Sequence, residues 1–214
     1  MTPPGNESID TTLNGKSRSD GCPGRLIIIS GPSGAGKSTV VRQLIEQCDL
    51  PLELSVSATT RPPRPGEVDG KHYHFLSEDA FAQKRQMGDF LECKQVFNLG
   101  HWYGTLRQQV ATGLAEGKWV ILEIDVQGAL AVLEHAEFNP ITIFIHPGSM
   151  DELERRLRQR GTETEAAIAG RLEAAASEMR FLSHYKYEII NGSVDLAVTE
   201  ICQLLESQRD MHPC

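Results

Sequence analysis

GPSGAGKST, residues 31–39, directly follows the apolar run LIII at residues 26–29. A short, continuously apolar and β-branched run is typical of a strand that is buried on both faces of a parallel sheet. The pattern G-x-x-x-x-G-K-S between a strand and a helix is the context in which a phosphate-binding loop works. The stretch therefore predicts an anion site where the backbone passes from a strand into a helix.

The residue types in this loop suit a nucleoside triphosphate. Glycines allow the backbone to curl until several N–H groups point inward, and those groups together with the helix N-terminus attract an anion. We expect Lys37 to reach the β- and γ-phosphates and Ser38 to offer its hydroxyl to Mg²⁺. A glycine-rich turn without a ligand is the alternative. The loop alone selects no reaction, because GTPases, ATP-driven motors and small-molecule kinases all use it.

Composition narrows the classes of protein that fit. A chain of 214 residues, 40% of them hydrophobic, suits one domain with a real core. A formal net charge of −8 disfavours nonspecific binding to nucleic acid, and no apolar run approaches the ~20 residues of a membrane span. The five cysteines are odd in number and form no CxxC pair, which favours reduced thiols in a cytoplasmic protein. The sequence indicates no oligomeric state.

Segments with the patterns of strands and helices alternate along the chain, which predicts an α/β fold with a parallel sheet. Residues 1–24 lack an apolar core and are rich in small and polar residues, so we expect a disordered tail. The helix after the loop is expected at residues 38–48. Further strands are expected at residues 119–124, 141–145 and 188–190.

Residues 58–105 interrupt this alternation. They begin with ATTRPPRPGEVDGKHYHF, in which three prolines and two glycines indicate loop and turn. Residues 72–75 alternate like a strand, residues 77–88 suit a helix capped by a serine, and residues 90–97 suit another strand. We therefore predict an insert with a small sheet of its own.

Residues 149–182 predict two helices joined by a tight turn. The capping-box patterns S-x-x-E, from Ser149, and T-x-x-E, from Thr162, would each open one helix. Gly161 is a natural end for the first helix. The arginines that crowd its last turn are Arg155, Arg156, Arg158 and Arg160.

Arg61 and Arg64 form a candidate clamp for a second anion. They lie three residues apart in TTRPPRPGE, whose prolines restrict the backbone and hold the guanidinium groups in place. Rigid, planar guanidinium forks suit bidentate recognition of phosphate. The alternative is a solvated loop rich in arginine and proline, and the segment alone does not decide between the two.

Five motifs occur in one order along the chain: SATTRPPRPGEVDGKHYHF, DFLE, WYGT, EIDVQGA and RRLRQRGTETE. In order and spacing they resemble the guanylate kinase family, roughly from residue 25 to residue 206. The resemblance implies a three-layer P-loop NTPase fold and transfer of a phosphoryl group from ATP, with Mg²⁺, to GMP or dGMP. It implies a kinase domain at 25–208, with a core (25–57, 106–148, 183–208), a GMP-binding insert (58–105) and a lid (149–182), followed by a C-terminal tail at 209–214.

By motif position the resemblance implies an acceptor site for GMP in the insert. Glu92, in DFLE, would accept hydrogen bonds from the adjacent N1–H and N2–H₂ donors of guanine, whereas adenine presents an unprotonated N1. Two arginines and two phenols would hold the phosphate. The implied GMP-binding residues are Ser57, Arg61, Arg64, Tyr73, Glu92, Tyr103, Thr105 and Asp125.

The arginine-rich turn matches the lid of the family. Arg156 and Arg160 share a helix face, and Arg171 lies on the next helix. The implied catalytic residues, which would neutralise charge during transfer, are Lys37, Arg61, Arg156, Arg160 and Arg171. The implied ATP-binding residues are Gly31, Ser33, Gly34, Ala35, Gly36, Lys37, Ser38, Thr39 and Asn191. Ser38 and Glu123 would hold Mg²⁺, in part through water.

Three features depart from the family pattern. Two extra residues lie near Asn98 and Leu99, Glu123 stands where aspartate is usual, and Asn191 is followed by glycine and serine instead of two acids. Two alternatives to a guanylate kinase are a binding module of the same fold without activity, and a kinase with another phosphorylated acceptor. The intact loop and lid argue against the first, and Glu92 with the TTRPPRPGE segment argues against the second.

Overall fold

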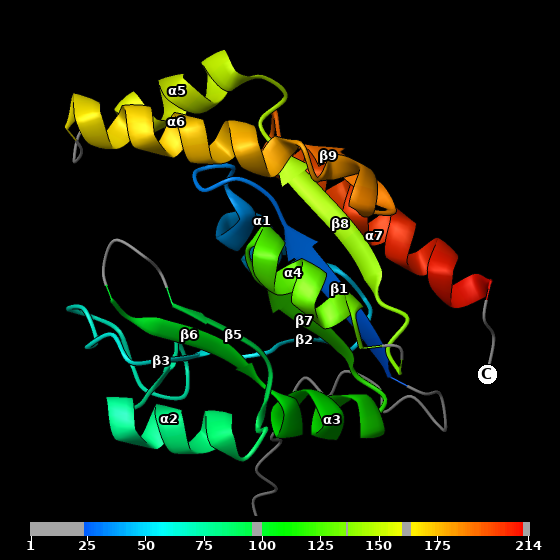
Figure 1. Ribbon diagram of the computed structural model, residues 1–214. Helices are drawn as coiled ribbons and strands as arrows, with labels where there is room; N and C mark the ends of the chain where they lie inside the picture. The colour runs from blue at the N-terminus through cyan, green and yellow to red at the C-terminus, as the bar shows by residue number, and fades with distance from the viewer. Residues whose placement is uncertain (1–23, 96–99, 136, 160–163, 212–214) are drawn as a thin grey trace, which may run out of the picture.

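The computed structural model describes residues 24–95, 100–135, 137–159 and 164–211, in which strands and helices build two sheets (Figure 1). The central sheet has the spatial order β2 (Leu52–Leu54), β7 (Trp119–Glu123), β1 (Arg25–Ser30), β8 (Ile141–His146) and β9 (Tyr187–Ile190). Every neighbouring pair in it is parallel. The predicted parallel core is therefore confirmed, and β2 is a strand that the sequence pattern did not indicate.

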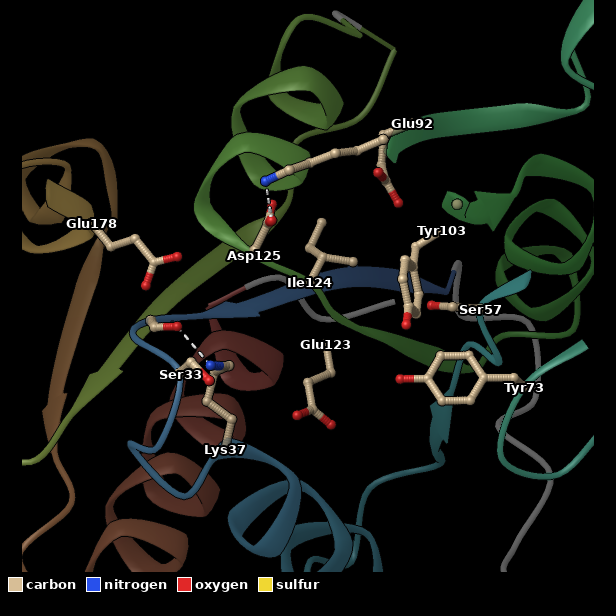
Figure 2. Close-up of a pocket in the computed structure, with 13 residues that line it drawn as sticks. Ser33, Lys37, Ser57, Tyr73, Glu92, Tyr103, Glu123, Ile124, Asp125 and Glu178 are labelled. Carbon is tan, nitrogen blue, oxygen red and sulfur yellow. Dashed lines mark hydrogen bonds and ion pairs between the residues drawn. The ribbon is translucent and has the colours of Figure 1, made fainter. Parts of the chain in front are cut away.

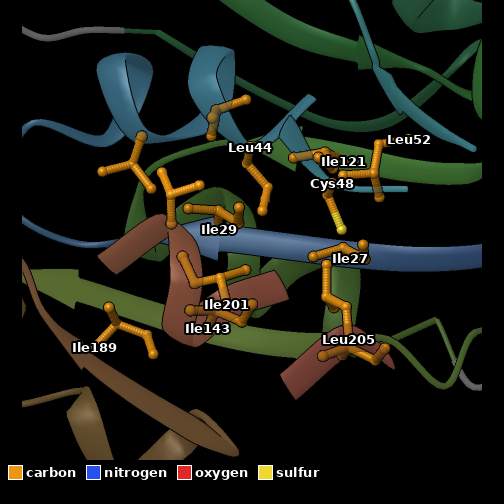
Figure 3. Packing of buried hydrophobic residues seen from close by; sticks show 14 of the residues in the cluster. Ile27, Ile29, Leu44, Cys48, Leu52, Ile121, Ile143, Ile189, Ile201 and Leu205 are labelled. Carbon is orange, nitrogen blue, oxygen red and sulfur yellow. The ribbon is translucent and has the colours of Figure 1, made fainter. Parts of the chain in front are cut away.

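Helices cover both faces of the central sheet, which gives three layers. The alternating side chains of β1 explain why this strand is apolar throughout. Ile27 and Ile29 pack against the helices of one face (Figure 3), and Leu26 and Ile28 pack against those of the other. The first face carries α1 (Lys37–Gln47) and α7 (Val194–Asp210), and the second carries α3 (Arg107–Ala115) and α4 (Val126–Leu133).

The insert has a separate four-stranded sheet, as predicted. Its spatial order is β4 (His74–Phe75), β3 (Ala58–Thr59), β6 (Trp102–Leu106) and β5 (Phe90–Gln95). Helix α2 (Glu78–Gln86) packs on this sheet, where the rings of Phe81 and Phe90 stack at 4.4 Å. The hydroxyl of Ser77 caps α2, as expected. The predicted strand at residues 72–75 is only two residues long.

The two predicted helices of the lid are α5 (Met150–Gln159) and α6 (Glu165–Met179), and they lie together at one end of the molecule (Figure 1). The hydroxyl of Ser149 accepts from the N–H of Glu152, as its capping box predicts. The prediction for Thr162 is wrong, because Thr164 is the residue that caps α6 and accepts from the N–H of Ala167 at 3.3 Å.

The helices of the described ranges share one further property. None of them is both long enough and apolar enough to cross a lipid bilayer.

A short 3-10 helix, Leu182–His184, connects α6 to β9 of the central sheet.

Because β1 is buried on both faces, its side chains should contribute strongly to the free energy of unfolding. Replacing Ile27, which is 0% exposed, with alanine should lower the free energy of unfolding by about 2–5 kcal/mol, because it removes buried methyl groups and leaves a cavity. Ile190→Ala is the matched control, since Ile190 lies in β9 of the same sheet but is 56% exposed. Urea unfolding of both variants checks this, and equal losses would contradict the proposed layering.

Candidate active site

The loop between β1 and α1 needs glycine at two positions for different reasons. Gly36 caps α1 with φ 88°, a left-handed conformation that side chains rarely adopt. A Cβ at Gly31 would lie 2.0 Å from the carbonyl oxygen of Ile145 in β8, so the loop packs directly on the neighbouring strand. The geometry leaves the N-terminus of α1 facing out of the sheet edge, where it can bind an anion.

Lys37 folds back over this loop. Its Nζ donates to the carbonyl oxygens of Gly31, at 2.6 Å, and Pro32, at 3.0 Å. Burial lowers the pKa of Lys37, while the nearby carboxylates of Glu123, Glu178 and Asp125 oppose that shift. The ammonium group is therefore held beside the loop and among acids.

Ser38 and Glu123 meet at the mouth of the loop. The Ser38 hydroxyl donates to Glu123 Oε1 at 2.5 Å, and Glu123 is the last residue of β7. Since β7 pairs in parallel with β1, the two strands end at the same edge of the sheet. The two predicted metal ligands are thus brought together as adjacent oxygens.

One cavity of about 400 Å³ extends from the loop to the insert (Figure 2). Lys37 lies toward one end, Tyr73 and Tyr103 lie toward the other, and Glu123 lies between them. The predicted site residues that line this cavity are Gly31, Ser33, Lys37, Ser57, Tyr73, Glu92, Tyr103, Glu123 and Asp125. The structure therefore joins the predicted donor and acceptor sites in a single space.

Glu92 lies on β5 and projects into this cavity. Thr105, on the paired strand β6, donates to Glu92 Oε1 at 2.7 Å and is itself buried. Burial raises the pKa of Glu92, and the charge of Asp125 raises it further. A carboxylate in this position is oriented by Thr105 and has an oxygen, Oε2, that this contact leaves unengaged.

Asp125 carries two contacts that differ in kind. Its Oδ1 accepts from the N–H of Gly128 at 2.8 Å and so caps α4, and its Oδ2 forms an ion pair with Lys94 of β5. Asp125 therefore performs a structural role at the start of α4 in addition to any contact with a ligand.

Arg61 is 7% exposed and is held inside the insert. Its guanidinium donates to both oxygens of Glu67 at 2.9 Å and to the carbonyl of Pro62 at 2.8 Å, and it lies 5.4 Å from the ring centre of Tyr73. Glu67 also accepts from the backbone N–H of Arg64 at 2.7 Å. Neither arginine lines the cavity in this arrangement. Their segment is thus ordered around Glu67, which sequence reasoning missed.

The lid arginines differ in what they contact. Arg156 donates to Glu152 at 2.7 Å and to the carbonyl oxygen of Asn191 at 2.6 Å, and Arg171 lies 3.4 Å from the Ser33 hydroxyl of the loop. Arg155 pairs with Glu152, and Arg158 pairs with Glu154 and Glu165. The prediction for Arg160 lies outside the described residues, as does that for the extra residues near Asn98 and Leu99.

A second cavity, of about 290 Å³, also borders the loop. The predicted ATP-binding residues that line it are Gly34, Gly36, Thr39 and Asn191, together with Arg156 of the lid. Ala35, also predicted, is buried. Asn191 is 1% exposed, and its amide Nδ2 donates to the carbonyl oxygen of Ala35 at 2.7 Å. Asn191 therefore braces the loop, and its implied role in binding ATP stays a prediction.

A sequence profile of the family described as guanylate kinase matches residues 23–208. The chain belongs to the guanylate kinase family. A guanylate kinase from Rhodopirellula baltica is 68% identical over 192 residues, which cover 90% of this chain and 92% of that protein. A guanylate kinase from Sphingopyxis alaskensis is 46% identical over 186 residues, covering 87% and 83%. The crystal structure of guanylate kinase from Anaplasma phagocytophilum has a TM-score of 0.69 at 31% identity, covering 87% of this chain and 86% of that chain.

Two charged residues that line the cavity, Lys94 and Glu178, were missed by motif reasoning. Lys94 lies two residues after Glu92 and so on the same face of β5, which the strand pattern could have indicated. Glu178 comes from α6, and nothing in its local sequence indicates a site. Its Oε2 is buried without a hydrogen-bond partner in the described part of the chain, and burial raises its pKa while Lys37 opposes the shift.

The pairing of Arg61 with Glu67 predicts an unusually acidic carboxyl. Hydrogen bonds from Arg61, and then from the Arg64 backbone, lower the pKa of Glu67 to about 2. The pair therefore contributes to stability above the ordinary pKa of a glutamate, about 4.3, and is lost as the pH falls toward 2. In Arg61→Met, the Glu67 pKa should rise by about one unit or more, yet remain below 4.3 because the Arg64 N–H still donates.

Carboxyl-detected NMR titration of the wild type and Arg61→Met measures this shift. Glu152 is an internal control, because its pKa is also lowered to about 2 but by Arg155 and Arg156. An unchanged Glu67 pKa in the variant would show that the pair is not formed in solution.

Proposed function

We propose that this chain transfers the γ-phosphoryl group of ATP to GMP, and also to dGMP, giving ADP and the guanosine diphosphate. The observation that carries the proposal is the single cavity, in which the phosphate loop and the carboxylate of Glu92 face one space. The guanylate kinases that the chain resembles bear this activity in their name. We propose a role for each residue of the site on the same grounds.

The loop binds the triphosphate of ATP. Backbone N–H groups from Gly31 to Thr39 and the start of α1 attract the phosphates, and Lys37 exchanges its contacts with the loop carbonyls for contacts with the β- and γ-phosphates. The second cavity, beside Thr39 and Asn191, is the space for the rest of the nucleotide.

The residues at the mouth of the loop fit a magnesium ion. The hydroxyl of Ser38 and the carboxylate of Glu123 are adjacent oxygen ligands, the type that Mg²⁺ prefers. No group of three or more His, Cys, Asp and Glu side chains forms a metal cage within the described residues, in keeping with an ion held by few protein atoms, water and substrate phosphates. When bound, Mg²⁺ would offset charge on the phosphates, and Glu123 would hold it directly or through water.

The insert binds the acceptor. Glu92 accepts from N1–H and N2–H₂ of guanine, with Thr105 fixing the orientation of its carboxylate, and Ser57 and Asp125 lie beside it for further contacts to the base. The side chains of Tyr73 and Tyr103 line the cavity, where their hydroxyls would contact the phosphate of GMP. The guanidinium groups of Arg61 and Arg64 would neutralise this dianion, whose oxygens compete with Glu67 for the donors of Arg61.

The transfer itself needs no proton-accepting side chain. An oxygen of the GMP phosphate, already ionised near neutral pH, forms a bond to the γ-phosphorus while the bond from that phosphorus to the bridging oxygen of ADP breaks. Closure of the lid would bring Arg156, Arg160 and Arg171 over the phosphates and exclude water. Charge neutralisation and alignment are therefore the catalytic contributions of this chain.

The proposal includes the division into a core, an insert over residues 58–105 and a lid over residues 149–182, with the tails outside them. It places the reaction in the cytoplasm, for which the support is the cysteines: Cys48, Cys93 and Cys202 are free thiols.

A coupled assay of ADP release with GMP, dGMP, AMP, CMP and UMP as acceptors tests the function. We expect turnover with GMP and dGMP, and rates at least about a hundredfold lower with the other three, because only guanine presents two adjacent donors to Glu92. No turnover with any acceptor would favour an inactive binding module. Preferred turnover of an acceptor without guanine would favour a kinase of the same fold with another substrate.

Glu92→Gln tests the recognition of the base. The amide keeps the shape of the side chain but turns one acceptor oxygen into a donor that faces the guanine donors, so kcat/KM for GMP should fall by about 10²–10⁴-fold. The matched control, Glu200→Gln, changes an exposed glutamate of α7 and should leave kcat/KM unchanged.

A triple variant that combines Glu92→Ala, Arg61→Met and Arg64→Met tests the location of the acceptor site. If calorimetry found normal GMP binding in this variant, the acceptor site would lie elsewhere.

A further inference from the structure

Lys94 is a cation inside the acceptor site to which the proposed mechanism gives no task. It lies on β5, where it shares a strand face with Glu92 and pairs in register with Tyr103 of β6. Its ammonium forms an ion pair with Asp125, at the start of α4 in the core. Lys94 thus connects the insert to the core at the position where the base of GMP would bind.

The cavity that Lys94 enters is rich in acids. Carboxylates reach it from β5, the end of β7, the start of α4 and α6, and two substrates that are themselves anions have to enter. The acids are Glu92, Glu123, Asp125 and Glu178, whereas the only cations among the described residues that line the cavity are Lys37 and Lys94. Lys37 is bound to the loop carbonyls, so Lys94 is the cation available at the acceptor end.

Glu92 and Asp125 are near neighbours. A Cβ on Gly128 would lie 3.2 Å from Glu92 Oε2 and 3.5 Å from Asp125 Oδ1, so both carboxylates border the same small volume. Two carboxylates that share a site favour protonation of one of them. Burial and the charge of Asp125 both raise the pKa of Glu92, whereas Lys94 opposes them.

Protonation of Glu92 would harm recognition of guanine. A protonated carboxyl has an O–H donor in place of one acceptor, and it would face a base edge that presents only donors. The charged form of Glu92 is therefore the form that selects GMP, and a nearby cation that favours it strengthens binding.

We propose that Lys94 is a positioning residue of the acceptor site: its ammonium offsets the Asp125 carboxylate and so keeps Glu92 in the charged form that guanine requires. Lys94 acts through Glu92 and Asp125 and does not itself touch GMP. This inference rests on the proposed function. The other titratable groups that face the cavity, and so also act on Glu92, are Lys37, Tyr73, Tyr103, Glu123 and Glu178.

Calorimetric titration of GMP, without ATP, at pH 6.0 and pH 8.0 tests the proposal with Lys94→Met. The substitution removes the charge but keeps an unbranched chain, and Glu92 should become easier to protonate. We expect the dissociation constant for GMP to rise by up to about tenfold at pH 6.0, the upper limit for a shift of one pKa unit, and by less than about threefold at pH 8.0. The GMP phosphate titrates in this range, but equally for every variant, so the ratio to wild type removes its effect.

Two further variants separate charge from shape. Lys94→Arg keeps the cation and should bind GMP within about threefold of wild type at both pH values. Lys84→Met is the matched control, because Lys84 also lies in the insert, is paired with Asp89 and is 41% exposed against 32% for Lys94, but does not line this cavity. It should leave the dissociation constant unchanged.

A double-variant cycle identifies the partner. In an Asp125→Asn background the carboxylate that Lys94 offsets is absent, so Lys94→Met should produce a smaller loss at pH 6.0 than it does with Asp125 present. A loss of the same size in both backgrounds would overturn the assignment of Asp125 as the partner.

Other outcomes overturn the inference as well. These are unchanged or tighter binding of GMP by Lys94→Met, a loss that is equal at both pH values, and Lys94→Arg behaving like Lys94→Met. If the wild-type chain does not bind GMP, the proposed function fails together with the inference. Normal binding by the wild type with no effect of Lys94→Met would remove only the role of Lys94.

Discussion

Electrostatic repulsion is the constraint on which the arrangement of this site depends. In the proposed reaction, two phosphorylated nucleotides would have to meet end to end in a cavity that already holds four carboxylates. The loop offsets part of this repulsion with backbone N–H groups, which lose no side-chain entropy when they bind an anion and need no counter-ion. Lys37 and Lys94 supply positive charge within the cavity, whereas Arg156 is engaged by Glu152 and by the carbonyl oxygen of Asn191 and does not line it.

The apolar core makes this arrangement possible because it fixes where the charged groups emerge. β1 is buried on both faces, so its end, and the loop that follows, cannot rotate relative to β7 and β8. The parallel pairing with β7 then brings Glu123 to Ser38, and the start of α4 brings Asp125 to the insert. The chemistry of the site is thus set by strand register in the layer beneath it.

Sequence patterns predicted the features that depend on consecutive residues. The loop, the strand before it, the Ser77 and Ser149 caps and the family were all found from local motifs, and the structure and comparisons confirm them. Strands of two residues, such as β3 and β4, are too short to produce a period. The cap of α6 was misassigned because threonines two residues apart both precede a helical pattern, and the hydroxyl nearer the first turn forms the bond.

Contacts between distant segments could not be found in this way. The pairs of Lys94 with Asp125 and Asn191 with Ala35 join residues 31 and 156 positions apart, respectively. Each depends on which strands are neighbours and in which register, and no local pattern contains that information. The pair of Arg61 with Glu67 differs from these, because the two residues lie only six positions apart in a segment that is constrained by its prolines.

The position of Asn191 has a consequence for communication between the lid and the loop. Its amide holds the Ala35 carbonyl, and its backbone carbonyl accepts from Arg156, so one asparagine at the end of β9 is shared by two parts of the molecule that are far apart in sequence. Moving Arg156 toward phosphate breaks one of these bonds and leaves the other in place. Binding of the nucleotide and the position of α5 are then coupled. Thermodynamic reciprocity requires that the free energy by which the nucleotide shifts α5 equals the free energy by which that shift of α5 changes the affinity for the nucleotide.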